Sequence, residues 1–133
     1  MFEWFGDKVT QEIKLAACDG AKFTLEEIAT DAKRRCPVDT GILSDSIAIT
    51  FDEIPNSTDL YREAQSGKIP TPNVGIFEKG YVSVNAPYAY KQHEDLSLSH
   101  TQGEAKYLEK AFNLKSKNLE KNTKKYAQAR GLL

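Results

Sequence analysis

Several signals that mark particular protein classes are absent from this 133-residue chain. It contains no CxxC, GxGxxG, HExxH or GxSxG pattern and no Walker-type phosphate-binding loop, so no common catalytic or cofactor motif is present. Its apolar runs are only a few residues long, which excludes a transmembrane helix, and its first residues lack the features of a secretory signal. We therefore expect a soluble protein, without a cofactor or a metal, that is made in a cytosol.

Cysteine is scarce as well, with only Cys18 and Cys36 in the chain. Both fall in one predicted helix, where 18 residues at ~1.5 Å each separate them by roughly 27 Å. That distance is far beyond the reach of a disulfide. We expect two reduced and partly buried thiols that serve packing, rather than a reactive thiol or a metal ligand.

The net charge of −1, from 18 basic and 19 acidic residues, hides an uneven distribution. Residues 104–133 hold eight basic and three acidic residues, a net charge of +5, which leaves −6 for residues 1–103. This asymmetry favours head-to-tail self-association, an acidic partner or nonspecific contact with nucleic acid. A solvated, lysine-rich helix face is the alternative. With 40% apolar residues, the chain is long enough for one core, so residues 1–133 are predicted to form a single domain.

The first half of the chain begins with a helical pattern. Apolar residues recur every three or four positions and predict one amphipathic helix from residue 7 onward: Val9, Ile13, Ala17, Ala21, Leu25, Ile28 and Ala32. Gly20 lies inside the pattern and favours a kink or a break. Pro37 prevents the helix from continuing, and the residues that follow predict a rigid turn containing Asp39, Thr40 and Gly41.

After this turn, residues 42–46 are expected to form one helical turn, and alternating Ile47, Ile49 and Phe51 predict a half-buried strand. Residues 53–73 show no period and contain three prolines, so they are predicted to form a long loop. Residues 74–85 alternate on both sides of a short turn, which predicts a β-hairpin whose second strand ends at Pro87.

The last third is predicted to begin with one or two helical turns over residues 88–94. A second long helix is marked by Ala105, Leu108, Phe112 and Leu119. Its apolar stripe fades toward the C-terminus, so its last turns are expected to find little to pack against within the chain. The fold class is therefore α+β, with an antiparallel sheet of three to four strands covered on one face by the two long helices. Residues 1–6, 53–73 and 117–133 are expected to extend from this body.

Two groups of residues are candidates for a site. His93, Glu94, Asp95 and His100 have side chains that suit a metal or a general base, but their spacing supports neither, so a structural role in a loop is expected. Phe2, Trp4 and Phe5 either pack ahead of the first helix or anchor the chain on a neighbouring subunit.

The residues after the first helix, Cys36-Pro37-Val38-Asp39-Thr40-Gly41-Ile42-Leu43-Ser44-Asp45-Ser46-Ile47, resemble a signature of the neck, or tail-component, family of tailed bacteriophages. Members of this family are also described as tail-completion or minor capsid proteins. Two later blocks are similar to the same family. One is Val84-Asn85-Ala86-Pro87-Tyr88-Ala89-Tyr90, followed by His93-Glu94, and the other is Gly103-Glu104-Ala105-Lys106-Tyr107-Leu108-Glu109-Lys110-Ala111.

This resemblance implies a non-enzymatic virion protein at the head–tail junction, present in the host cytoplasm during assembly. It implies a homo-oligomeric ring of six or twelve copies between the connector or stopper and the tail terminator or tail tube. Structural roles are then expected for the motif residues: Pro37, Asp39, Thr40, Gly41, Pro87, Tyr88, Tyr90, His93 and Glu94. Three segments outside the motifs are expected to form ring contacts because of their aromatic residues, lack of a period or positive charge, not because of the resemblance. They are the N-terminus with Phe2, Trp4 and Phe5, the loop over residues 55–72, and the basic end with Lys117, Lys121, Lys124, Lys125 and Arg130.

Three alternatives remain at this point. The chain is a minor capsid protein elsewhere in the virion, a small metal-dependent enzyme that uses His93, Glu94 and His100, or a regulatory protein that binds nucleic acid through its basic tail. If the basic tail binds nucleic acid in a phage protein, we expect nonspecific contact with packaged DNA. The sequence offers no zinc-finger or RNA-recognition motif to support specific recognition.

Overall fold

The structure is a computed structural model that describes residues 6–37, 41–87 and 106–133, with side chains described from residue 8 onward. These residues form a mixture of helix and sheet, as predicted. The elements follow one another as α1 (Gly6–Arg35), α2 (Ile42–Asp45), β1 (Ile47–Phe51), α3 (Ser57–Ala64), β2 (Gly80–Val84), α5 (Tyr107–Lys115), the short 3-10 helix η1 (Ser116–Asn118) and α6 (Leu119–Ala129).

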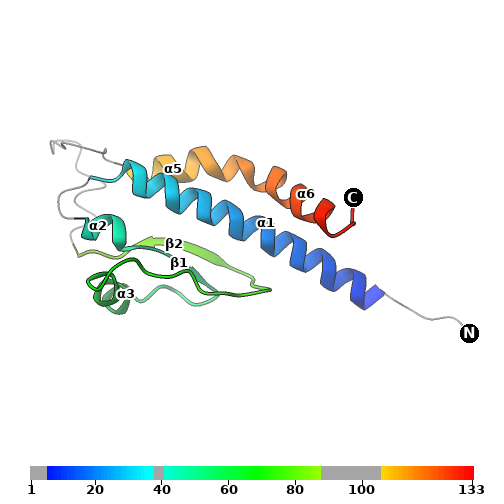
Figure 1. Cartoon of the computed structure of the whole chain (residues 1–133), viewed down its shortest axis with the longest axis horizontal. Coiled ribbons are helices and arrows are strands. Elements are labelled where there is room, and N and C mark those ends of the chain that lie inside the picture. The colour runs from blue at the N-terminus through cyan, green and yellow to red at the C-terminus, as the bar shows by residue number, and fades with distance from the viewer. Residues whose placement is uncertain (1–5, 38–40, 88–105) are drawn as a thin grey trace, which may run out of the picture.

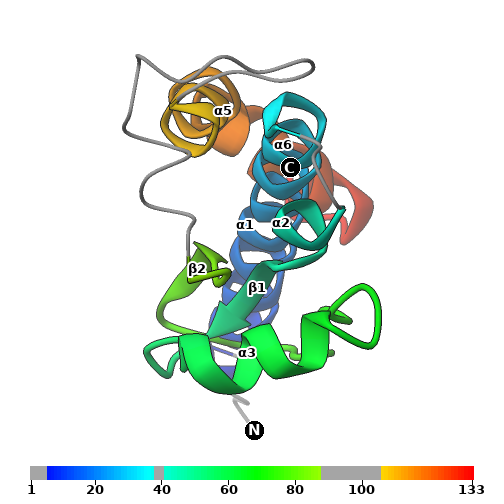
Figure 2. The ribbon, with the colours of Figure 1, turned by 90° about the vertical axis from the view of Figure 1, so that its left-hand side faces the viewer.

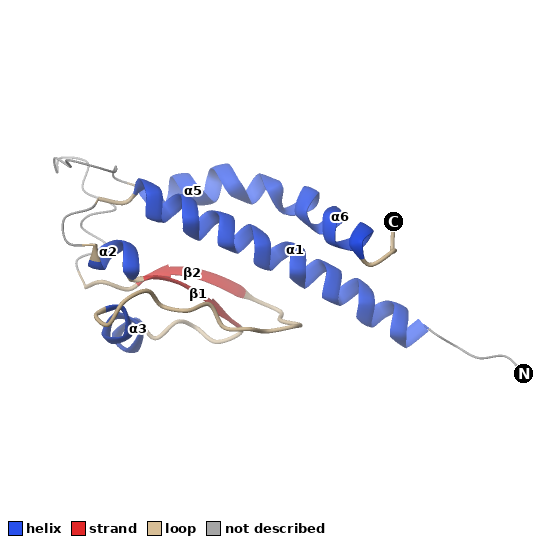
Figure 3. Ribbon diagram, in the orientation of Figure 1, coloured by secondary structure: helices blue, strands red, loops and turns tan. Residues whose placement is uncertain are grey.

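The elements stack in layers on either side of α1. Helices α5 and α6 run along one side of α1, the sheet lies against the other side, and α3 covers the far face of the sheet (Figures 1 and 2). Figure 3 shows that helix accounts for most of the described chain, with the two strands held between α1 and α3. The central position of α1 means that it must bury two faces instead of one.

Helix α1 is continuous through Gly20, without the break that this glycine led us to expect. The predicted apolar stripe is only partly correct. Ile28 and Ala32 are buried, but Val9 and Ile13 are about half exposed, at 49% and 53% of their full accessible surface. The buried positions instead include Ala16 and Thr24, because the α6 side of α1 is lined with small and polar side chains.

The sheet has two strands among the described residues, fewer than the three to four predicted. Strand β1 pairs antiparallel with β2, in a register that sets Ile47 opposite Val84 and Phe51 opposite Gly80. Both faces of β1 are covered, since Ala48 is buried as well as Ile47 and Ile49. The long helices all lie on one side of the sheet, and the opposite face is covered by the short helix α3, which the sequence did not predict (Figure 2).

Helix α3 lies inside the segment that we expected to be a loop. Asn56 caps it, because its side-chain oxygen accepts a hydrogen bond from the backbone N–H of Asp59 at 3.1 Å. Ala64 is buried at its end, and Tyr61 packs against the core. Two helical turns between a proline and a glycine are too short for the apolar period to stand out, which explains the wrong prediction.

The predicted hairpin over residues 74–85 is also wrong. Only its second half is a strand, and that strand pairs with β1. Asp52, in the left-handed conformation (φ 65°), accepts hydrogen bonds from the backbone N–H groups of Glu78 and Lys79 at 2.8 and 3.1 Å. Phe77 packs against Phe51 with ring centroids 4.6 Å apart. These contacts bring the start of β2 to the end of β1, so residues 74–77 have no strand partner among the described residues.

The C-terminal arm packs closely against α1, which corrects the expectation that its last turns have little to contact. It is nearly continuous helix through α5, η1 and α6. Tyr107 and Ala111 are fully buried, whereas Phe112 and Leu119 are exposed, so the face that packs is rotated from the predicted stripe. Part of the predicted apolar face, including Phe112 and Leu119, is therefore exposed at the side of the arm.

Some of the other predictions are confirmed, and one lies outside the described residues. Helix α2 and strand β1 lie where they were predicted, and both cysteines are free and buried, with Cys36 directly after the end of α1. No helix in the described ranges is long and apolar enough to span a membrane. The predicted turns over residues 88–94 lie outside the described residues.

Candidate functional site

The three sequence blocks that carry the phage resemblance come together in one core. The first block contributes Cys36, Leu43 and Ile47, the second contributes Ala86, and the third contributes Tyr107 and Ala111. All six side chains are buried, and they pack with Ile28, Ala29, Ala32 and Ile49. Segments about 20 to 75 residues apart in the chain thus converge at the C-terminal end of α1.

The first block forms the junction between α1 and the sheet. Cys36 continues the helical hydrogen bonding with a 2.9 Å bond from its N–H to the carbonyl of Ala32, and Pro37 is buried beside it. Gly41 precedes α2 with φ 81°, a left-handed conformation that favours glycine. Pro37 and Gly41, the two ends of the predicted turn, therefore have the conformations expected of them: the helix ends before Pro37, and Gly41 is left-handed. Asp39 and Thr40 lie outside the described residues.

The thiol of Cys36 is part of this packing. Burial raises the pKa of the Cys36 thiol, and a hydrogen bond with Ser44 opposes that effect only in part. The Sγ atom donates to the carbonyl of Lys33 at 3.3 Å. A buried thiol with a raised pKa is a poor nucleophile, so the chemistry of Cys36 agrees with a packing role.

A polar clamp joins the first block to the second. Asn85, at the end of β2, donates from Nδ2 to the carbonyl of Ser46 at 2.7 Å and to Oγ of Ser83 at 3.1 Å. Ser46 is fully buried, and its hydroxyl donates to the carbonyl of Leu43 at 2.7 Å. These hydrogen bonds hold the end of α2 against the end of β2. They lie just beyond Ile47 and Val84, the last pair of the β1–β2 ladder.

We expect Asn85→Ala to lower the free energy of unfolding by about 1–2 kcal/mol, because it leaves the buried Ser46 carbonyl with one hydrogen-bond donor fewer. Urea unfolding followed by circular dichroism measures the change. Ser83→Ala is the matched control, since it removes one weaker bond of the same clamp and should cost less. An Asn85→Ala protein as stable as the parent would contradict the role of the clamp.

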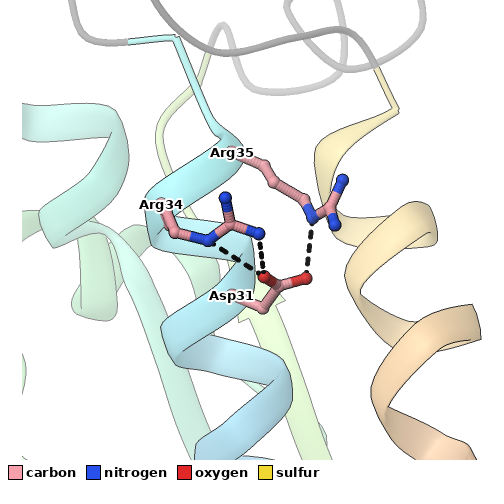
Figure 4. A network of polar contacts seen from close by, with 3 residues as sticks. All are labelled: Asp31, Arg34 and Arg35. Carbon is pink, nitrogen blue, oxygen red and sulfur yellow. Dashed lines mark hydrogen bonds and ion pairs between the residues drawn. The ribbon is translucent and has the colours of Figure 1, made fainter.

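Asp31 forms a second polar cluster at the C-terminal end of α1 (Figure 4). Its carboxylate is almost fully buried. Arg34 donates to Oδ1 from Nη2 at 2.6 Å and from Nε at 3.2 Å, and Arg35 donates to Oδ2 from Nε at 2.7 Å. Burial by itself raises the pKa of Asp31, but the hydrogen bonds and positive charges of the two arginines outweigh it and hold the pKa below its ordinary value.

The lowered pKa of Asp31 predicts a pH dependence of stability. Since the folded pKa lies below the unfolded pKa of about 3.9, the stabilisation is fully present above that value and is lost as pH falls through the folded pKa. Asp31→Asn should cost about 1–2 kcal/mol at pH 7 and much less at pH 2–3.

Urea unfolding of both proteins at each pH tests this prediction. Asp59→Asn is the control, because Asp59 is exposed and lies 3.7 Å from exposed Arg62. Its cost should stay below about 0.5 kcal/mol at any pH. A cost for Asp31→Asn that does not change between pH 7 and pH 2–3 would contradict the assignment.

Polar residues join α1 to η1 and α6, the last part of the C-terminal arm. Glu27 accepts hydrogen bonds from Asn122 at 2.6 Å and from Asn118 at 3.1 Å, one on each carboxylate oxygen. Asn122 also donates to Oγ1 of Thr24 at 2.9 Å. This buried network fixes the register of the two helices.

Two of the cations that we expected in contacts between subunits are used within the chain. Arg130 donates to Glu12 at 2.9 Å and to Asp19 at 3.0 Å, and these carboxylates raise the pKa of its guanidinium, Asp19 more than Glu12. Lys125 lies over the ring of Phe23, 5.0 Å from its centroid. Some positive charge of residues 104–133 is therefore paired with negative charge of residues 1–103 within one subunit.

The remaining predicted contact cations stay on the surface. Lys117 and Lys121 are exposed, and Lys124 forms an exposed ion pair with Glu120 at 3.1 Å. They do not gather into a site with the motif residues, because they lie on η1 and α6.

A groove of about 390 Å³ lies between β2, α1 and α5. Leu25 and Ile28 of α1 form one wall, Leu108 and Phe112 of α5 form another, and residues 80–82 of β2 complete it. Phe112 is 55% exposed at its edge. The sequence pattern placed Leu25, Leu108 and Phe112 in a core, and it contained no signal that they would line an open groove.

Several predicted site residues lie outside the described residues: Phe2, Trp4, Phe5, Tyr88, Tyr90, His93, Glu94, Asp95 and His100. Pro87 is described and exposed, three residues after β2 ends. In the described part of the chain, no group of three or more histidine, cysteine, aspartate or glutamate side chains is arranged to hold a metal ion.

Sequence reasoning missed the Asp31 cluster, the Asn85 clamp and the Glu27 network. Asp31 and Glu27 look like ordinary charges of a helix surface, and the only available signal was the pair of basic residues three and four positions after Asp31. Comparison of the chain with models of protein families, with curated proteins and with solved structures gave no match.

Proposed function

We propose that this chain is a non-enzymatic structural protein of a tailed-bacteriophage virion, a neck or tail-completion protein at the head–tail junction. The observation that carries the proposal is the convergence of the three resembling blocks in one core, through Cys36, Leu43, Ile47, Ala86, Tyr107 and Ala111. Blocks that together specify one fold are expected to pack in one core, so this convergence supports the resemblance.

The described surface supports an assembly role. Large apolar side chains are exposed on several elements: Val9, Ile13, Ile54, Ile76, Phe112, Leu114, Leu119 and Leu133. Single exposed apolar side chains are common on soluble proteins, but the exposed ring of Phe112 continues the apolar walls of the groove between β2, α1 and α5. Contiguous apolar surface of this kind is a mark of contact with other proteins. Strand β2 also has no second neighbouring strand among the described residues, and an open strand edge is a ready site for pairing with another chain.

A ring explains how such surfaces are used. Each subunit of a ring presents two different surfaces, one for each neighbour, and the contact repeats until the ring closes. We propose six or twelve copies, which join the connector or stopper to the tail terminator or tail tube. The exposed lysines of η1 and α6 leave nonspecific contact with packaged DNA as part of this proposal.

The copy number and position in the virion test the proposal. Quantitative mass spectrometry of purified particles of the encoding phage should give six or twelve copies of the chain per particle. Gold-labelled antibody against the chain should mark the head–tail junction. A label spread over the capsid would overturn the neck assignment in favour of a minor capsid protein, and absence from the particle would overturn the virion role.

A further inference from the structure

The groove between β2 and α5 is an apolar site that the chain leaves open. Its walls are formed mainly by Leu25, Ile28, Val82, Leu108 and Phe112, and it has the volume of a small binding pocket. Phe112 keeps more than half of its surface exposed at the groove. A groove with these properties can accept one or two large apolar side chains.

The N-terminal part of α1 carries exposed apolar side chains of the kind that the groove can accept. Its first turns extend past the sheet and the C-terminal arm (Figure 1), and Val9 and Ile13 are exposed there. Immediately before this helix, the sequence places Phe2, Trp4 and Phe5. Three large aromatic side chains next to an exposed apolar helix end are suited to serve as anchors in a pocket.

The length of the chain excludes the groove of the same subunit as their binding place. Leu25 lies 19 residues after Gly6 along a continuous helix, a distance of ~28 Å at ~1.5 Å per residue. Phe2 is only four residues from Gly6, and an extended segment of that length spans at most ~14 Å. The aromatic segment therefore cannot enter the groove from its own subunit.

We propose that the groove binds the aromatic segment, residues 2–5, of a second copy of the chain. The donor surface lies at the free end of α1 and the acceptor surface lies beside the middle of α1, so the contact joins two different surfaces. Such a head-to-tail contact repeats from copy to copy and closes into a ring when the rotation permits. The inference rests on the proposed function in taking a second copy of the chain as the partner.

Trp4 is the only tryptophan in the sequence, so its fluorescence reports directly on this contact. The full chain should show a blue shift of tryptophan emission as its concentration rises, in parallel with self-association in analytical ultracentrifugation. Phe112→Glu should abolish the shift and weaken self-association by about 30-fold or more, as expected for the loss of a buried anchor site.

Asn113→Glu is the matched control, because Asn113 is the next residue on the same helix, is exposed and does not line the groove. This variant should keep both the shift and the association. Circular dichroism should show that Phe112→Glu and Asn113→Glu are folded, which is expected because both positions are on the surface.

A mixing experiment separates contact between copies from contact within one copy. The Phe112→Glu chain keeps Trp4 but lacks a working groove, and a Trp4→Ala chain keeps the groove but lacks the fluorophore. Adding excess Trp4→Ala chain should shift the emission of the Phe112→Glu chain to the blue, whereas adding Trp4→Ala/Phe112→Glu chain should not.

Emission that stays the same at every concentration and in the mixture would overturn the inference, whether Trp4 is then buried in its own subunit or exposed to water. Self-association without any change in Trp4 emission would overturn the inference and leave the proposed virion function standing. Conversely, the expected shift in a chain that is absent from virions would support the contact and overturn the virion function.

Discussion

Gly20→Ala is expected to destabilise the protein by about 2 kcal/mol, although alanine is the better helix former. A Cβ atom on Gly20 would lie 2.6 Å from the Cα and 2.8 Å from the backbone N of Thr123 in α6. These are backbone atoms that cannot rotate away, so we expect the upper end of the overpacking cost, about 3 kcal/mol. The gain in helix propensity, about 1 kcal/mol, offsets only part of it.

Urea unfolding followed by circular dichroism measures this effect. Thr30→Ala is the matched control, because it places alanine at an exposed position of the same helix and should change stability by less than about 0.5 kcal/mol. A Gly20→Ala protein that is as stable as the parent, or more stable, would contradict the close approach of α1 and α6 at Gly20 and Thr123.

The largest effect of a single substitution is expected for Tyr107→Ala, at about 4 kcal/mol. Among the described residues, Tyr107 is the largest fully buried side chain, and it lies where the three resembling blocks meet. Its removal takes away the transfer free energy of an aromatic ring and leaves a cavity in the core. For a domain with a total stability of about 5–15 kcal/mol, such a loss approaches unfolding.

Phe112→Ala is the appropriate comparison, since it removes an aromatic ring from an exposed position of the same helix. In dilute protein it should cost less than about 1 kcal/mol. Thermal unfolding by calorimetry would rank the two variants. Equal costs for the two would contradict the position of Tyr107 at the centre of the core.

The sequence predicted the elements that carry a strong local signal. Helix α1, the turn of α2 and strand β1 have a clear period or a clear boundary, and the structure confirms all three. The single domain, the phage resemblance and the roles of the residues outside the described ranges stay predictions. The mixture of helix and sheet followed from the order of these patterns.

The errors arise where long-range contacts override the local pattern. Residues 74–77 alternate like a strand, yet Asp52 binds the backbone at Glu78 and Lys79 and brings the start of β2 to the end of β1 instead. On α1, the stripe beginning at Val9 and Ile13 predicts burial, but the adjacent C-terminal arm packs against small and polar positions such as Gly20. A period identifies an apolar face without showing which element covers it.

The candidate site could be predicted only in outline. The signature at residues 36–47 indicated the junction between helix and sheet, and the packing of Cys36 and Leu43 agrees with it. The groove could not be predicted, because it arises from three elements distant in sequence. The charge asymmetry was a partial guide, since Arg130 satisfies some of it by binding Glu12 and Asp19 in its own subunit.

The proposed role at the head–tail junction can be tested by electron microscopy of particles made by the encoding phage after deletion of this gene. We expect separate, DNA-filled heads and unattached tails, with joining restored when the chain is supplied from a plasmid. Normal, joined and infectious virions in the absence of the chain would contradict this role.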